Sequence, residues 1–267
     1  MHLILDILRD GLSYQQALAI QADWYEDEGL SLAAMALRPQ SHITANWKRY
    51  LVAVHKDRYI IWGDCSFQQY NIPNGPCIAA IARGLHYYVG LTLQGEVIVW
   101  GDNDFGQCDV PSGLRAVTIA ARYHHSLALT REGQVVAWGA GHYRKCEVPD
   151  GLRAVAVSAG WDHSLALTPD GRVVAWGDNS FDQCEVPDGL RAVTILAGYS
   201  HSLAITPEGR VVAWGSDNLG QCNVPDGLRA VAVAVGENYS MALTPEDEVV
   251  VWGARGRYRT PVLAEGM

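Results

Sequence analysis

The stretch VPDGLRAVAVSAGWDHSLALTPDGRVVAWG (residues 148–177) decides the fold of this chain, because the sequence repeats it almost letter for letter. The dipeptide Trp-Gly closes each copy, and it begins at residues 62, 100, 138, 176, 214 and 252. Every interval is therefore 38 residues. A constant spacing of this length is typical of repeat architectures, in which each copy folds into one supersecondary unit.

Each copy contains three short apolar runs, which we interpret as β-strands. In the quoted copy they are AVAVSAG (154–160), HSLALT (163–168) and RVVAWG (172–177). Thr168-Pro169-Asp170-Gly171 places Pro and Gly where a tight turn needs them, so the second and third strands are predicted to form an antiparallel hairpin. A parallel β-helix needs no hairpin inside its coil, and the turn therefore argues against that fold.

The predicted strands are apolar on both faces. Val173 and Ala175 point to one side of the third strand, and Val174 and Trp176 point to the other. Such a sheet needs cover on both sides, and radial packing of small sheets covers each one with its two neighbours. We predict an all-β fold, a β-propeller of six 38-residue blades spanning residues 40–267. The first copy is degenerate and little chain follows the last one, so a seven-bladed or incomplete ring is left open.

Residues 1–39 do not repeat and are predicted to form a short α-helical segment. Ser13 and Gln16 have the spacing of a capping box, residues 17–26 keep helical spacing, and Gly29 is a stop signal. We expect this segment to pack on the propeller or to cover an exposed edge of it.

Composition excludes several classes of partner. A length of 267 residues with 49% hydrophobic content indicates a globular protein, and a net charge of −9 argues against nucleic acid. No apolar run reaches the roughly 18 residues that cross a bilayer, and the acidic start differs from a secretory signal, so we expect a cytoplasmic protein without a membrane partner. Four of the six cysteines recur on equivalent positions of successive blades and are predicted to be free thiols: Cys108, Cys146, Cys184 and Cys222.

The unit AGWDHSLALTPDGRVVAWGDNSFDQC (159–184) resembles the repeat of the regulator of chromosome condensation family, over residues 41–253 of this chain. The short repeat with V-P-D-G-L between blades is similar to a bacterial branch, which includes a propeller-type inhibitor of β-lactamases. The resemblance implies a propeller that binds a protein with one rim. The family's nucleotide exchange on a small GTPase depends on an inserted β-wedge and basic extensions, and this sequence has neither. The start (18–38) is similar to a bacterial repeat-companion domain, which implies no chemistry.

Residues that stay constant among the copies are assigned to the scaffold. The six Trp-Gly tryptophans are predicted to pack between blades. His125, His163 and His201 recur once per blade, each before a serine, and the same position holds Tyr87 and Tyr239 in copies two and six. Imidazole suits metal binding and acid–base chemistry, but a hydrogen bond to backbone or to a neighbouring blade explains the repetition better.

Residues that change among the copies are the candidates for function. The turn between strands one and two carries a pair that differs chemically in every copy, and equivalent turns of a propeller emerge on one face. Its aromatic members are expected to form an arc there, flanked by polar groups, as in protein-binding hot spots. The alternative interpretation is that these pairs are scattered surface residues that bind no partner. The predicted partner-binding residues are Trp47, Lys48, His86, Tyr123, His124, Trp161, Asp162, Tyr199, Ser200, Glu237 and Asn238.

The loop after the third strand also varies among the copies. In copy three it carries His142, Arg144 and Lys145, whose positive charge could meet an acidic patch on a partner or could simply be solvated.

We predict a non-catalytic protein-interaction module, an adaptor or an inhibitor, with no cofactor and no metal. The sequence contains no phosphate-binding glycine loop, zinc signature or nucleophile elbow. The alternative from another class is binding or hydrolysis of a small molecule or carbohydrate in an axial pocket with His86, His124 and Asp162. Nucleotide exchange on a small GTPase is a further alternative. The partner's identity and the oligomeric state are left open, and an open ring would favour dimers through its blade edges.

Overall fold

A computed structural model of the chain describes residues 41–46, 50–55, 58–63, 78–246 and 248–254, with side chains described from residue 79 onward. The predicted helical segment lies outside these residues, and so do Trp47, Lys48 and the tail from residue 255. Within the described ranges, the regular secondary structure is β-strand apart from one short 3-10 turn, and no helix has the length and apolar character needed to cross a membrane.

The described strands form six antiparallel sheets, each of three strands that follow one another along the chain. Blades one and two consist of β1 (Ser41–Asn46), β2 (Tyr50–His55), β3 (Arg58–Gly63), β4 (Ile78–Arg83), β5 (Tyr87–Thr92) and β6 (Val97–Gly101). Blades three and four consist of β7 (Thr118–Arg122), β8 (His125–Leu129), β9 (Val135–Gly139), β10 (Ala156–Ala159), β11 (His163–Leu167) and β12 (Val173–Gly177). Blades five and six consist of β13 (Thr194–Ala197), β14 (His201–Ile205), β15 (Val211–Gly215), β16 (Ala232–Val235), β17 (Tyr239–Leu243) and β18 (Val249–Gly253). A short 3-10 turn, η2 (His142–Arg144), follows β9.

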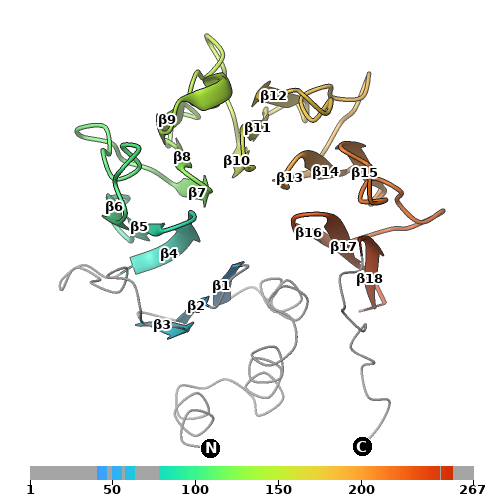
Figure 1. Cartoon of the computed structure of the whole chain (residues 1–267), viewed down its shortest axis with the longest axis horizontal. Coiled ribbons are helices and arrows are strands. Elements are labelled where there is room, and N and C mark those ends of the chain that lie inside the picture. The colour runs from blue at the N-terminus through green and yellow to red at the C-terminus, as the bar shows by residue number, and fades with distance from the viewer. Residues whose placement is uncertain (1–40, 47–49, 56–57, 64–77, 247, 255–267) are drawn as a thin grey trace, which may run out of the picture.

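The six sheets stand around a common centre as the blades of a propeller (Figure 1). The first strand of each blade lies innermost and contacts the first strand of the next blade, from β1 round to β16. The predicted propeller of six three-stranded blades is confirmed for the described residues.

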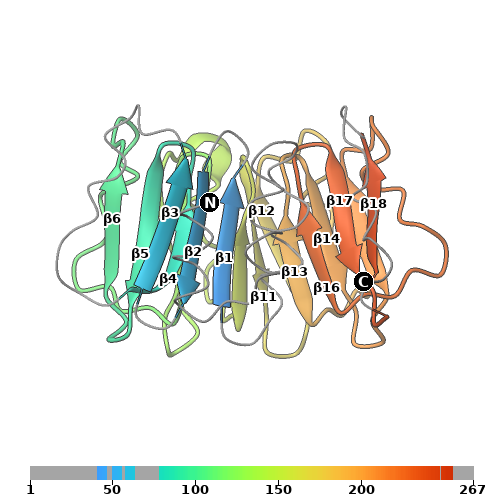
Figure 2. The same ribbon diagram turned by 90° about the horizontal axis from the view of Figure 1, so that it is seen from below.

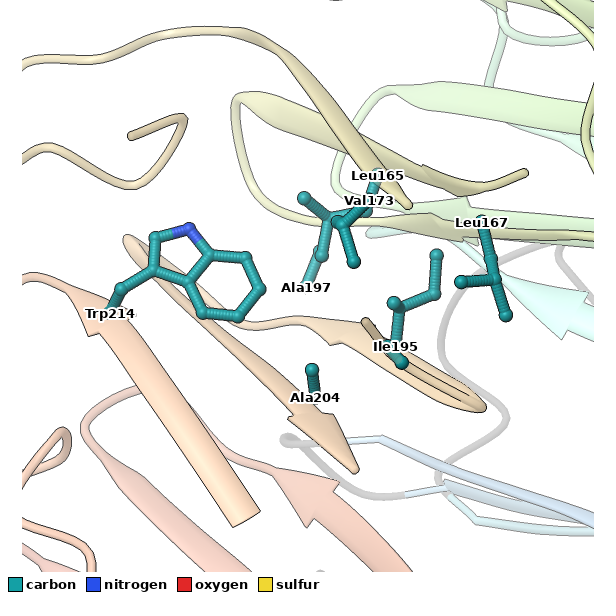
Figure 3. Packing of buried hydrophobic residues seen from close by; sticks show 8 residues of the cluster. Leu165, Leu167, Val173, Ile195, Ala197, Ala204 and Trp214 are labelled. Atoms are coloured by element: carbon teal, nitrogen blue, oxygen red, sulfur yellow. The ribbon is translucent and has the colours of Figure 1, made fainter. Parts of the chain in front are cut away.

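Blades three, four and five each bury both faces of their sheets against their neighbours. Between blades four and five, the apolar cluster contains Leu165, Leu167, Val173, Ile195, Ala197 and Trp214 (Figure 3). Equivalent clusters lie between blades three and four and between blades five and six. The recurring tryptophans with described side chains are at most 8% exposed, which confirms their predicted packing role: Trp100, Trp138, Trp176, Trp214 and Trp252.

Hydrogen bonds tie each blade to the loop of the blade before it. The indole N–H of Trp176 donates to the Lys145 carbonyl over 2.9 Å, and the Ser164 hydroxyl donates to the same carbonyl over 3.0 Å. The carbonyls of Gln183 and Gln221 each accept the same two bonds from the next blade along. A buried carbonyl loses its water on folding, so these bonds also fix the register of neighbouring blades.

The hairpin between strands two and three forms as its sequence predicts. In blade four, β11 and β12 pair in antiparallel register, and the Gly171 N–H donates to the Thr168 carbonyl over 2.9 Å. Gly171 has a φ of 81°, in the left-handed region that favours glycine.

The bond from Trp176 supplies a first test of the scaffold. Replacing Trp176 with phenylalanine is expected to lower the free energy of unfolding by about 2 kcal/mol, because a buried hydrogen bond and part of the indole volume are lost. Urea denaturation measures the change. Val193→Ala is the control, since Val193 is 56% exposed and its replacement should shift stability by no more than about 0.5 kcal/mol. Equal losses in both variants would contradict the assigned role of the indole.

Candidate functional site

The variable turns and the variable loops meet on one face of the disc. In blade four, the Asp178 N–H at the start of the loop donates to the carbonyl of Asp162 in the strand one–two turn, over 2.8 Å. The same bond joins Ala140 to His124 and Ser216 to Ser200. Figure 2 shows the ends of first and third strands, such as β1 and β3, at the same edge of the disc. We call this surface the site face: turns 84–86, 122–124, 160–162, 198–200 and 236–238, and the loops that follow the third strands.

Three aromatic rings of the site face form one continuous stack. The Tyr123 and Trp161 ring centroids lie 3.9 Å apart with an interplanar angle of 20°, and those of Trp161 and Tyr199 lie 4.0 Å apart at 40°. These residues come from three successive blades, so the predicted convergence of aromatic side chains is confirmed for them. We call this stack the aromatic arc. Trp47 and Lys48, which the sequence analysis placed beside it, lie outside the described residues.

The stacking of the three rings determines which part of the aromatic arc a partner can reach. Trp161 lies between its neighbours in the order of the blades, so both faces of its indole are covered. All three side chains are only partly buried, and for Trp161, whose faces are covered, the ring edge is the part that is left accessible. An aromatic edge carries positive partial charge, while the face is negative. Because each ring braces the next, the arc is rigid before any partner arrives, which reduces the entropy lost on binding.

The buried ammonium group of Lys145 contacts the turns that carry the aromatic arc. Lys145 is 1% exposed, and its Nζ donates to Asp162 Oδ1 over 2.5 Å and to the Trp161 carbonyl over 3.4 Å. The same Nζ lies 5.5 Å from the centroid of the Tyr123 ring, within cation–π range. One side chain thus holds the turns of blades three and four together.

Lys145 stands where copies one, two, four and five of the repeat have glutamine. Gln183 and Gln221 are also buried, but each bonds within its own loop, to Asp178 and to Ser216 respectively. The sequence analysis treated Lys145 as loop charge and missed its role. The sequence did carry a signal for this role, because Lys145 replaces the glutamine of the repeat.

The remaining predicted residues surround the aromatic arc. His124 is 9% exposed and lies against the rings of Phe105 and Tyr123, at centroid distances of 4.5 Å and 4.0 Å. Burial first, and then the Lys145 ammonium, lower the pKa of His124. Burial, followed by the negative charges of Glu237 and Asp162, raises the pKa of Tyr199.

Three further predicted residues belong to the turns of the site face. The carbonyls of His86, Ser200 and Asn238 accept bonds from the first N–H of the following loops, at 2.8 Å each. The described members of the predicted set therefore share one face, and the aromatic members among them lie together.

The recurring histidines serve the scaffold, as their repetition indicated. His163 Nε2 lies 3.0 Å from Ser202 Oγ in the next blade, and His125 and His201 make the same contact with Ser164 and Ser240. Because these hydroxyls already donate to backbone carbonyls, each Nε2 carries a hydrogen and donates it to the serine oxygen.

The described structure also bears on metal binding and on the reactivity of the cysteine thiols. Among the described residues, no three His, Cys, Asp or Glu side chains gather closely enough to hold a metal ion. The predicted free thiols are confirmed for Cys108, Cys146, Cys184 and Cys222. The Cys184 thiol donates to the Asp178 carbonyl over 3.2 Å, and burial raises its pKa to about 12. A thiol held in its protonated form is a poor nucleophile.

Three segments of the chain match the model of the regulator of chromosome condensation repeat, at residues 78–107, 154–183 and 193–221. The resemblance carried by the A-G-x-x-H-S-L motif is therefore confirmed, and the chain contains repeats of this type. No curated protein matches the sequence significantly.

Solved propellers have the same fold. The ectodomain of the Physcomitrella patens receptor kinase CR4 aligns with a TM-score of 0.67 at 20% identity, covering 85% of this chain and 66% of that one. Prp20p from Saccharomyces cerevisiae aligns with a TM-score of 0.58 at 23% identity, covering 67% and 57%. The Arabidopsis thaliana ACR4 ectodomain aligns with a TM-score of 0.66 at 17% identity, covering 80% of each chain. This chain spans less than two thirds of the first two, and at these identities the likeness concerns the fold alone.

Proposed function

We propose that this propeller of regulator of chromosome condensation repeats is a non-catalytic interaction module, which binds a partner protein through the aromatic arc of its site face. The observation that carries the proposal is the stack of Tyr123, Trp161 and Tyr199. The blades would fold without it, because the repeat tolerates quite different residues in the same turns. Rigid, part-exposed aromatic side chains bury a large area at small entropic cost, and they are enriched where proteins bind proteins.

The geometry favours a protein over a carbohydrate. A sugar ring binds by stacking on an open aromatic face, but both faces of Trp161 are covered by Tyr123 and Tyr199. His124 and Asp162, which the alternative would use in an axial pocket, are engaged with Phe105 and Lys145. A protein surface can instead pack against ring edges and the polar turns around them. The structurally similar yeast Prp20p offers a parallel, since it is described with its binding to Gsp1p and histones and in a complex with Kap60.

The double variant Trp161→Ala/Tyr199→Ala tests the proposal. The immobilised full-length chain is incubated with an extract of the cells that produce it, and captured proteins are quantified by mass spectrometry. At least one protein captured by the parent is expected to fall by tenfold or more with the double variant, because truncating hot-spot aromatics costs about 2 kcal/mol or more each.

The matched control is Val155→Ala/Val193→Ala. These valines are 54% and 56% exposed, and they precede β10 and β13 at the opposite face of the disc. The control should capture the same proteins as the parent. An arc variant that is folded, by its thermal transition, and still captures every protein in parental amounts would contradict the proposed function. Binding of a sugar by the parent in a glycan array, lost with the arc variant, would favour the alternative.

A further inference from the structure

Arg122 replaces a glycine of the repeat at the inner end of a blade. The motif A-G-x-x-H places glycine at the end of the first strand, and blades two, four, five and six have Gly84, Gly160, Gly198 and Gly236. Blade three has arginine. Four sister blades fold without any side chain at this point, so the scaffold does not require one. The arginine therefore calls for an explanation outside the repeat.

The Arg122 side chain extends across the mouth of the ring. Its Nη1 donates to the Ala197 carbonyl over 3.3 Å, and its Nη2 donates to the Gly236 carbonyl over 3.4 Å. Ala197 ends β13 and Gly236 follows β16, and both strands stand on the other side of the centre from β7 (Figure 1). The guanidinium thus lies at the level where the innermost strands end on the site face. It directly precedes Tyr123 of the aromatic arc.

Among the described residues, these two bonds are the printed partners of the Arg122 guanidinium. A guanidinium has five N–H donors, and charge-assisted bonds to an anion are about 2.7 to 2.9 Å long. Both bonds of Arg122 are longer and end on neutral carbonyls. No carboxylate of the described residues forms an ion pair with it. Burial lowers the pKa of Arg122, while Tyr239 and Glu237 raise it, and an arginine keeps its charge in proteins.

Arg122 differs from the other cations on the blade-three side of the site face. Lys145 and Arg144 are each paired with a carboxylate, Asp162 and Glu147 respectively. The bonds of Arg122 to described residues end on neutral carbonyls. The side chain is part-buried, so some of its surface is accessible for a bond from outside. A cationic group that is partly removed from water is stabilised by an anionic partner.

We propose that Arg122 is an anion subsite at the centre of the site face, which receives the side-chain carboxylate of an Asp or Glu on a protruding loop of the partner protein. This inference rests on the proposed function, and it adds the chemistry of the partner. The aromatic arc contributes packing area around the loop. The guanidinium contributes selection, because among the unmodified side chains of a partner only the carboxylates of Asp and Glu offer two anionic oxygens that can accept two of its N–H groups in parallel.

A peptide pair tests the chemistry without a known partner. The probes are acetyl-Gly-Glu-Gly-amide and its glutamine counterpart, titrated into the full chain while the arginine Nε–H signals are followed by NMR. The signal that disappears in Arg122→Gly identifies Arg122. We expect the glutamate peptide to shift this signal saturably, with an affinity at least tenfold above that of the glutamine peptide, which corresponds to about 1.4 kcal/mol for a charge-assisted bond. Equal affinities, or no shift with the glutamate peptide, would overturn the proposal.

The capture experiment then separates this inference from the proposed function. Arg122→Gly restores the residue of the sister blades, and it should therefore fold with a nearly parental thermal transition. We expect it to lose the same captured proteins as the arc variant, by at least tenfold. If the arc variant loses a partner that Arg122→Gly retains, the proposed function stands and the anion subsite is wrong. If neither variant loses a protein, the proposed function fails, and the peptide pair still decides whether Arg122 selects carboxylates.

Discussion

Replacing Asp162 with alanine is expected to lower the free energy of unfolding by about 3 kcal/mol, because it leaves a charged ammonium buried without its anion. Lys145 is 1% exposed, and Asp162 Oδ1 is its carboxylate partner at 2.5 Å. After the substitution, the Trp161 carbonyl would be the remaining acceptor within reach, at 3.4 Å. Removing one member of a buried pair costs more than the pair contributes when intact, since the remaining charge keeps its desolvation penalty. Guanidinium denaturation measures the loss.

The repeat itself supplies the control for this prediction. Lys145→Gln installs the residue that blades four and five hold as Gln183 and Gln221, so the scaffold accepts it. In the Lys145→Gln background, Asp162→Ala should cost less than about 1 kcal/mol, because no buried cation is left unpaired. The difference between the two backgrounds gives the coupling of the pair. If Asp162→Ala costs the same in both, the ion pair does not hold the turns of blades three and four together.

Acidification from pH 6.5 to 4 is expected to remove much of the stability of the folded propeller. His125, His163 and His201 are fully buried, and each has an Nδ1 without a hydrogen-bond partner. Burial is the main cause that lowers their pKa values, to about 3 for His163 and about 4 for His201. The pKa of His125 is also lowered well below its ordinary value, by burial and then by Lys145.

The direction of the change in stability with pH depends on whether the folded or the unfolded chain binds more protons. The unfolded chain takes up protons on these histidines below about pH 6.5, whereas the folded chain does so only near pH 4 or lower. Their contribution is therefore fully present above pH 6.5 and is lost as the pH falls through this window. Each histidine contributes at most about 1.4 kcal/mol per pH unit, so the three together approach about 4 kcal/mol per unit. Urea midpoints measured at half-unit intervals give the slope.

A tyrosine variant isolates the histidines from the carboxylates, which also titrate in this range. Blade two already has tyrosine at the position, and the Tyr87 hydroxyl lies 2.9 Å from Ser126 Oγ of the next blade. Gly160 and Gly198 leave room for the ring, since a Cβ at Gly160 would lie 2.5 Å from the His163 ring. His163→Tyr/His201→Tyr should therefore fold and should lose about two thirds of the histidine slope. An unchanged slope would show that the buried imidazoles do not control acid stability.

The candidate site could be predicted in part because the repeat provides an internal comparison. Tyr123, Trp161 and Tyr199 occupy one offset in three successive copies, and a ring of equal blades brings equal offsets to one face. The roles of Lys145 and Arg122 were not predicted. Both replace a constant residue of the repeat, but the atoms they contact lie on other blades, 17 residues away for Lys145 and 75 and 114 residues away for Arg122. No spacing in the sequence encodes those distances.

The sequence by itself determined the unit of this protein: three antiparallel strands, the Thr-Pro-Asp-Gly hairpin, the packing tryptophans and the number of copies. These features are local or periodic, and backbone geometry and the need to cover two apolar faces act within one repeat and its neighbours. Only the tertiary structure decided that the aromatic rings stack face to face, that the Lys145 ammonium lies beneath them, and that Arg122 reaches across the mouth of the ring. These contacts depend on the angle and distance between blades, which arise from packing around the centre and not from any one copy of the repeat.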